Sequence, residues 1–129
     1  MNTTPQDIGN IAVMFLSIRN SVKIYHWQTP KYSRHKASDK LVFGLTDKID
    51  KFIEVFQGSR GTRLVVSNDN NFSMENQTDS SIINLLNAFK SYLSNTLPLY
   101  LLKTDTDLFN IRDEMLADIN QALYLFTFT

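Results

Sequence analysis

The sequence predicts an all-α protein that folds as a bundle of four helices, and three observations support this prediction. Apolar residues recur every three to four positions in four separate segments, which is the pattern of amphipathic helices. The segments are joined by short stretches, except for residues 58–79, which are rich in glycine and asparagine and lack a clear period. Hydrophobic residues make up 43% of the 129 residues, enough for one core, so we assign residues 1–129 to a single domain.

The first two helices are expected at residues 6–28 and 33–57. Pro30 ends the first helix, and Gly58 is the candidate C-cap of the second. The apolar stripe of the first helix comprises Ile8, Ile11, Phe15, Ile18, Val22 and Tyr25 or His26. The stripe of the second comprises Leu41, Leu45, Ile49, Phe52 and Phe56.

The last two helices follow the long connection, in which Leu64, Val65 and Val66 are expected to pack against the core. The third helix starts near Ser80 or Ser81, and Pro98 should kink or end it. The fourth begins after the cap candidate Asp105 or Thr106. The third stripe comprises Ile82, Leu86, Phe89 or Lys90, Leu93 and Leu97, and the fourth Leu108, Ile111, Met115, Ile119, Ala122 and Phe126.

The long connection also predicts how the helices are joined. The second helix has about 25 residues and is therefore about 37 Å long. A connection of about 22 residues can span that length when extended, so the second and third helices can run parallel. A four-helix bundle with one long crossover between helices two and three has the ferritin-like topology.

The composition restricts the classes of function. Thirteen basic and thirteen acidic residues cancel, so no overall charge favours nucleic acid or an anionic membrane. The chain contains no cysteine, so a metal site would need histidine and carboxylate ligands. We find neither a signal peptide at the N-terminus nor an apolar run of about 20 residues, and we expect a cytoplasmic protein without a membrane span.

The most unusual feature is a group of metal-type side chains on the second helix. At about 100° per residue, His35, Asp39, Asp50 and Glu54 fall within one arc of about 100°, away from the apolar stripe. The large apolar residues Phe43 and Ile53 share that arc. A face that mixes such side chains is typical of a surface buried against another chain.

These four residues cannot all belong to one site in one chain, because His35 and Asp50 lie about 22 Å apart along the helix. One possibility is two separate sites. The other is that two chains pair this face antiparallel, so that His35 and Asp39 of one chain meet Asp50 and Glu54 of the other. A third interpretation is a solvated helix face, since acidic residues four positions apart are common on such faces.

The motif resembles that of the Dps proteins, the miniferritins of bacteria and archaea. The order is His26-Trp27, then His35-x-x-x-Asp39, ten residues, and Asp50-x-x-x-Glu54. The resemblance implies a ferritin-like bundle that assembles from twofold dimers into a hollow homododecamer. It also implies a ferroxidase centre between two chains, with His26, His35 and Asp39 from one chain, Asp50 and Glu54 from the other, and Trp27 beside it.

The activity implied by the resemblance is oxidation of iron from Fe(II) to Fe(III), with hydrogen peroxide as oxidant and storage of the ferric mineral inside the shell. The sequence departs from the family at the first turn. Nine positions separate the two histidines here, against twelve in the family, and "WQTPKYSRH" replaces the usual tryptophan-asparagine and glycine. The lysine-rich terminal extension with which some members hold DNA is also missing, so the sequence argues against DNA compaction.

A second acidic group lies at the start of the fourth helix. Carboxylates favour helix N-termini, and this accounts for the group without any function. In the family iron enters through a threefold pore, and the residues that would line a pore here are Asp105, Asp107, Asp113 and Glu114. Two alternatives to the ferroxidase remain: a structural or DNA-associated ferritin-like shell with a weak or unused metal site, and a helical interaction module without metal.

Overall fold

The computed structural model describes residues 3–70 and 73–128, and within these ranges it contains helices and no strand. The long helices are α1 (Pro5–Gln28), α2 (Tyr32–Arg60), α3 (Asp79–Ser91) and α4 (Thr106–Leu125). The α3 helix continues into a π-helical turn, η1 (Tyr92–Thr96), and a 3-10 turn, η2 (Leu97–Tyr100). The predictions of an all-α fold and of four helices are confirmed.

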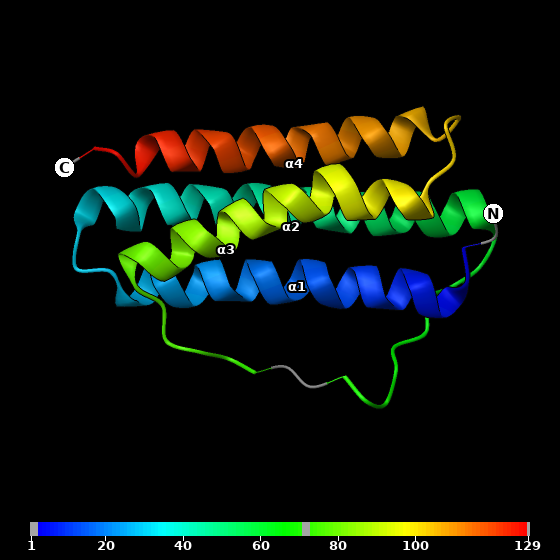
Figure 1. Cartoon of the computed structure of the whole chain (residues 1–129), viewed down its shortest axis with the longest axis horizontal. Coiled ribbons are helices and arrows are strands. Elements are labelled where there is room, and N and C mark those ends of the chain that lie inside the picture. The colour runs from blue at the N-terminus through cyan, green and yellow to red at the C-terminus, as the bar shows by residue number, and fades with distance from the viewer. Residues whose placement is uncertain (1–2, 71–72, 129) are drawn as a thin grey trace.

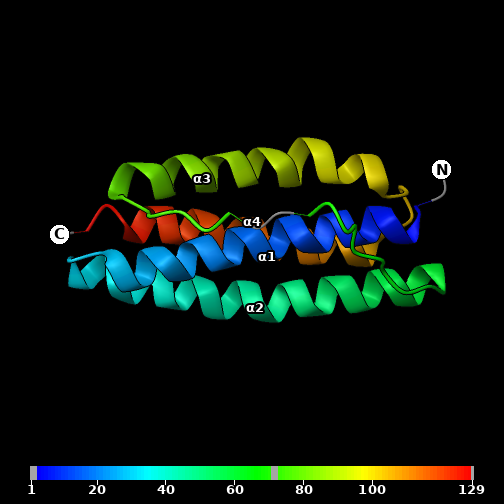
Figure 2. The same ribbon diagram turned by 90° about the horizontal axis from the view of Figure 1, so that it is seen from below.

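The four helices lie side by side along one long axis (Figures 1 and 2). The α1 and α2 helices are antiparallel and are joined by the short stretch Thr29–Lys31. The described parts of the connection after α2 lie on the outside of the bundle (Figure 1). The α2 and α3 helices run in the same direction, and α4 runs back against them. The α2 helix packs against α1 and α4, while α3 covers the other side of these two helices.

The core forms where the four predicted apolar stripes meet. Every stripe residue that the sequence predicts without an alternative is buried, and Phe89 rather than Lys90 is the buried member of its pair. The Phe15 ring lies at the centre and packs edge-on against Phe52, at 5.3 Å between centroids, and against Phe89, at 5.9 Å. The 3.6-residue period therefore predicted the core because burial of apolar area dominates the packing of each helix.

Side-chain caps fix the starts of two helices. Thr4 caps α1 in a capping box with Asp7, and Thr78 caps α3 in the same way with Ser81. Asp105 occupies the cap position of α4, as predicted, but makes no side-chain cap bond. Pro98 lies in the 3-10 turn that follows α3, so the prediction that it kinks or ends this helix is confirmed.

The end of α2 differs from the prediction, because Gly58 is not the C-cap. The helix continues to Arg60 and ends at Gly61, whose φ of 64° is left-handed, a conformation in which glycine has no steric penalty. The Arg60 side chain bonds to Asp105 near the start of α4. This pair holds the last turn of α2, and Gly58 remains in the exposed helix surface.

The long connection is attached to the bundle through both its backbone and an apolar side chain. Of the three predicted anchor residues, Leu64 packs against the core, whereas Val65 and Val66 are about half exposed. The Val65 N–H donates to the Pro5 carbonyl at 3.0 Å. A Cβ atom on Gly9 would overlap the Val65 carbonyl, so the absence of a side chain at Gly9 permits this crossing. No helix in the described part of the chain is long and apolar enough to span a membrane.

Candidate functional site

The two histidines meet at the end of the bundle where α1 turns into α2. His26 is the third-last residue of α1, and His35 is the fourth residue of α2. Their rings stack with centroids 3.9 Å apart and planes inclined by 19°. His26 is buried and His35 is half-buried. The short connection between the two helices thus brings the rings together.

Each imidazole is held by the backbone of the other residue. His26 Nδ1 lies 2.7 Å from the carbonyl oxygen of His35, and His35 Nδ1 lies 2.9 Å from the carbonyl oxygen of His26. A carbonyl oxygen only accepts hydrogen bonds, so each Nδ1 carries the hydrogen and donates it. When the rings are neutral, each Nε2 therefore keeps its lone pair, which is the form of histidine that binds metal.

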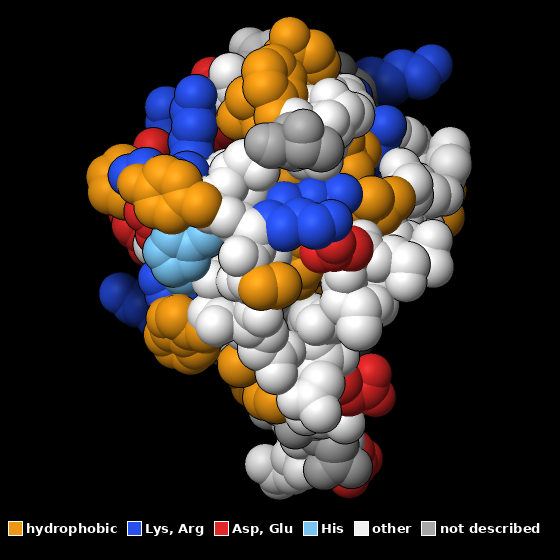
Figure 3. Space-filling model, turned by 90° about the vertical axis from the view of Figure 1, so that its left-hand side faces the viewer, with side chains coloured by type: hydrophobic (Ala, Val, Ile, Leu, Met, Phe, Trp, Pro, Cys, Tyr) orange, Lys and Arg blue, Asp and Glu red, His pale blue; other side chains and the backbone are white. Residues whose placement is uncertain are grey.

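Asp39 lies beside this histidine pair, one turn further along α2. Its Oδ1 atom is 3.7 Å from His26 Nε2 and 3.8 Å from Lys23 Nζ, and its side chain is 61% exposed. His26, His35 and Asp39 therefore occupy one region at this end of the bundle. Figure 3 shows histidine at the surface of this end of the bundle, among hydrophobic, acidic and basic side chains.

Two exposed aromatic residues border the histidine pair. Trp27 follows His26, is 66% exposed, and lies with its ring centroid 5.5 Å from Lys23 Nζ. Tyr32 is 72% exposed and stacks on His35, with centroids 6.3 Å apart. A large apolar area is therefore open to solvent beside the histidines.

Ser38 is the residue at this site that we did not predict from the sequence. Its side chain is completely buried, its Oγ donates to the His35 carbonyl at 3.1 Å, and the same Oγ lies 3.2 Å from His26 Nδ1. Its position on α2 could have identified it from the sequence. At 100° per residue, Ser38 falls in the middle of the apolar stripe of α2, where a polar side chain needs a buried partner.

The second predicted pair lies far from the first on the same helix. Asp50 and Glu54 are both exposed, and they begin fifteen residues after His35, about 22 Å along the axis. A hydrogen bond with Asp50, together with charge repulsion from it, raises the pKa of Glu54. The two carboxyl groups therefore lie close enough to share a proton.

The predicted ligands therefore lie in two separate groups within one chain. Within residues 3–70 and 73–128, no three histidine or carboxylate side chains come close enough to hold a metal ion. Phe43 lies on α2 between the two groups and is 80% exposed, whereas Ile53 is half-buried and packs against the chain's own core. Of the two apolar residues on the predicted arc, only Phe43 is thus largely open to solvent.

The acidic residues near the start of α4 do not form one group. Asp105 is buried, and its carboxylate accepts two hydrogen bonds from Arg60, at 2.6 and 3.0 Å, and one from the backbone N–H of Leu102. Hydrogen bonds from Arg60 lower the pKa of Asp105. Asp105 thus has a structural role in this chain. The other three predicted pore residues, Asp107, Asp113 and Glu114, are exposed.

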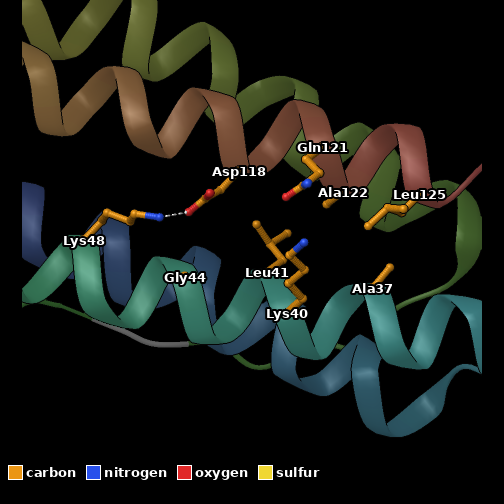
Figure 4. A pocket seen from close by; sticks show the side chains of 9 residues that line it. All are labelled: Ala37, Lys40, Leu41, Gly44, Lys48, Asp118, Gln121, Ala122 and Leu125. Atoms are coloured by element: carbon orange, nitrogen blue, oxygen red, sulfur yellow. Dashed lines mark hydrogen bonds and ion pairs between the residues drawn. The ribbon is translucent and has the colours of Figure 1, made fainter.

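A groove between α2 and α4 is one of several concave surfaces of the described chain (Figure 4). Its floor is apolar, and Lys48 closes one end through an ion pair with Asp118, at 2.6 Å. None of the predicted site residues lines this groove. The groove is therefore separate from the histidine pair.

Comparison with known families gives one result. Residues 26–126 match the model of a family of unknown function (DUF5856), and the chain belongs to this family. The matched stretch begins at His26 and includes all five predicted ligands. Neither the curated proteins nor the solved structures contain a match to the chain.

Proposed function

We propose that this member of the DUF5856 family is an iron-oxidising and iron-storing protein of the miniferritin type. Its ferroxidase centre would form between two chains, with His26, His35 and Asp39 from one chain and Asp50 and Glu54 from the other. The connectivity of the bundle, with α2 and α3 parallel, agrees with the ferritin-like topology that the proposal requires.

The observation that carries the proposal is the way the two imidazoles are held. Metal-ligating histidines almost always donate their other ring N–H to a carbonyl, carboxylate or water, which fixes the ring and its tautomer. Here both rings donate Nδ1–H to backbone carbonyls. The Nε2 lone pairs are left for a ligand, and Asp39 supplies a carboxylate 3.7 Å from Nε2 of His26.

The spacing along α2 supports a shared site. His35 and Glu54 have the same sequence midpoint as Asp39 and Asp50, between positions 44 and 45. If a twofold axis passes there and the two α2 helices are antiparallel, His35 meets Glu54 of the second chain, and Asp39 meets Asp50. Phe43 would lie about 2 Å along the helix from the axis, where its exposed ring is covered by the second chain.

The ligand types suit the oxidation of iron by hydrogen peroxide. Imidazole and carboxylate bind Fe(II), and the carboxylates favour the higher charge of Fe(III). Two Fe(II) ions each lose one electron, and one hydrogen peroxide takes both electrons as its O–O bond breaks. With two protons this gives two molecules of water, so no hydroxyl radical is released.

The shell is a further part of the proposal. Twelve chains, paired through α2, would enclose the space in which the ferric product is stored. The exposed carboxylates Asp107, Asp113 and Glu114 are candidates for the entry of Fe(II), because a ring of carboxylates attracts cations. The pairing of Asp105 with Arg60 removes Asp105 from this set.

Complementation between two inactive variants tests the shared site. His35→Ala and Glu54→Ala should each abolish most peroxide-dependent Fe(II) oxidation, whereas Asp47→Ala, which removes another exposed carboxylate of α2, should not. In a heterodimer of the two inactive variants, one site loses both ligands and the other keeps all of them. Reassembled heterodimers should therefore regain up to half of the wild-type activity per site.

Sites confined to one chain would give a different result. Each chain would then carry its own defect, and mixing would restore nothing. Heterodimers verified by native mass spectrometry that stay as inactive as their parents would exclude the shared site. Absence of iron from the wild-type protein after aerobic loading would exclude the proposed function altogether.

A further inference from the structure

We infer that Ser38 is a positioning residue for His26, which fixes the orientation of its imidazole and keeps the hydrogen on Nδ1. The inference rests on the proposed function and deepens it, because an imidazole held by Ser38 would direct Nε2 of His26 at the metal. Ser38 itself would not touch the metal.

The contacts of Ser38 leave its hydroxyl little freedom. The side chain is fully buried, and its hydroxyl hydrogen is donated to the His35 carbonyl at 3.1 Å. The oxygen therefore faces His26 Nδ1, 3.2 Å away, as an acceptor. The Nδ1–H of His26 thus has two acceptors, the His35 carbonyl and the Ser38 hydroxyl.

This arrangement opposes the alternative positions of the ring. A ring turned by 180° would place a C–H group against both acceptors, and a ring with its hydrogen on Nε2 would place a lone pair there. Either change would leave the buried Ser38 oxygen without the donor from His26, which is costly in a buried site. The serine therefore acts together with the closer His35 carbonyl to favour one ring orientation and one tautomer of His26.

The bond from Ser38 to a carbonyl of its own helix is not sufficient for this inference, because helical serines commonly bond back to the preceding turn. Ser21 in α1 does so, donating to the Ser17 carbonyl at 2.8 Å. The contact with His26 is what distinguishes Ser38. Ser21 makes no hydrogen bond to a histidine among the described residues and so provides a matched control.

The test compares Ser38→Ala with Ser21→Ala in the full chain. Alanine is a good helix former, and both acceptor carbonyls keep other donors, so both variants should fold. The first measurement is solid-state NMR of protein labelled with ¹⁵N-histidine, without metal and at about pH 8.5, above the ordinary histidine pKa of about 6.5. The chain has two histidines, so the signals can be assigned. The second measurement is the affinity for Co²⁺.

Wild type and Ser21→Ala should show the Nδ1–H form alone for both histidines. Ser38→Ala should show a second His26 signal of the Nε2–H form, and its Co²⁺ affinity should fall about tenfold, as is usual when a group that orients a metal ligand is removed. An unchanged ¹⁵N spectrum in Ser38→Ala overturns the inference, as does a Co²⁺ affinity within about twofold of wild type. If wild type binds no Co²⁺, the proposed function fails, and the metal-free spectra alone decide the role of Ser38.

Discussion

Replacement of Phe43 by glutamate tests the proposed pairing of two chains through α2. Phe43 is 80% exposed in the single chain, so it contributes little to the core and its loss should not affect folding. In the proposed dimer the ring lies near the twofold axis and is buried against the second chain. Glutamate would bring a charge into that contact, between the carboxylates of Asp39 and Asp47.

The size of the effect follows from the exposed area. A phenylalanine side chain offers about 200 Å², so an 80% exposed ring has about 160 Å² to bury, and the twofold axis doubles this to about 320 Å². At about 25 cal/mol per Å² the two rings contribute at most about 8 kcal/mol to association. Even half of this corresponds to a dissociation constant about a thousandfold higher.

The assay is sedimentation velocity at micromolar concentration, with far-UV circular dichroism to confirm folding. Wild type should sediment as a dimer or a larger assembly, and Phe43→Glu as a folded monomer. Tyr124→Glu is the matched control, because Tyr124 is an aromatic residue that is 63% exposed and belongs to α4, not to α2. A Phe43→Glu variant with the same mass as wild type would refute the interface, and so would a monomeric wild-type protein.

Three further predictions concern stability and nucleic acid. Hydrogen bonds from Arg60 lower the pKa of Asp105 in the folded protein. The pair therefore stabilises the fold fully at pH values above the ordinary aspartate pKa of about 3.9. This stabilisation is lost as the pH falls through the lowered pKa of Asp105 in the folded protein. Asp105→Asn should thus lower the free energy of unfolding by about 3 kcal/mol at pH 7 and by less at about pH 3, as measured by urea denaturation; an equal loss at both would contradict this. Gly9→Ala should displace the Val65 carbonyl, lower the free energy of unfolding by about 1 to 3 kcal/mol and speed proteolysis of the long connection. A Cβ atom at Gly58 meets no neighbour, so Gly58→Ala should raise the free energy of unfolding by about 0.5 to 1 kcal/mol. Equal effects of the two substitutions would exclude the close crossing at Gly9. Duplex DNA should not be retarded at about 150 mM salt, because the net charge is zero, and a shifted band would disprove this.

The fold could be predicted well from the sequence because its strongest determinant, the burial of apolar stripes, is periodic. The helices begin and end within a few residues of the predicted positions, and Phe15, Phe52 and Phe89 meet in the core. The end of α2 was missed because it depends on a partner distant in sequence. Arg60 bonds to Asp105, and a local pattern cannot show which of two nearby glycines, Gly58 or Gly61, becomes left-handed.

The sequence names candidate residues for the site but does not specify their geometry. The spacing along α2 placed His35 and Asp39 one turn apart, as the structure has them. The stacking of His26 on His35 depends on the angle at which α1 turns into α2, and helical periodicity does not specify that angle. The buried Ser38 was missed because the stripe was identified from its apolar residues alone. A single polar residue at a stripe position was therefore not considered as a buried residue.

Pro30, just after the end of α1, leaves the carbonyl of His26 free to accept a hydrogen bond from His35. In a helix the carbonyl of His26 would receive the N–H of the residue four positions later, but that residue is Pro30, which has no N–H. The His26 carbonyl is therefore free for another donor, and His35 Nδ1–H occupies it at 2.9 Å. The imidazole thus replaces a missing backbone bond at the end of α1, and the same bond fixes its own tautomer. The short turn between α1 and α2 therefore has two effects. It places the two histidines only nine positions apart, and it orients the imidazole of His35.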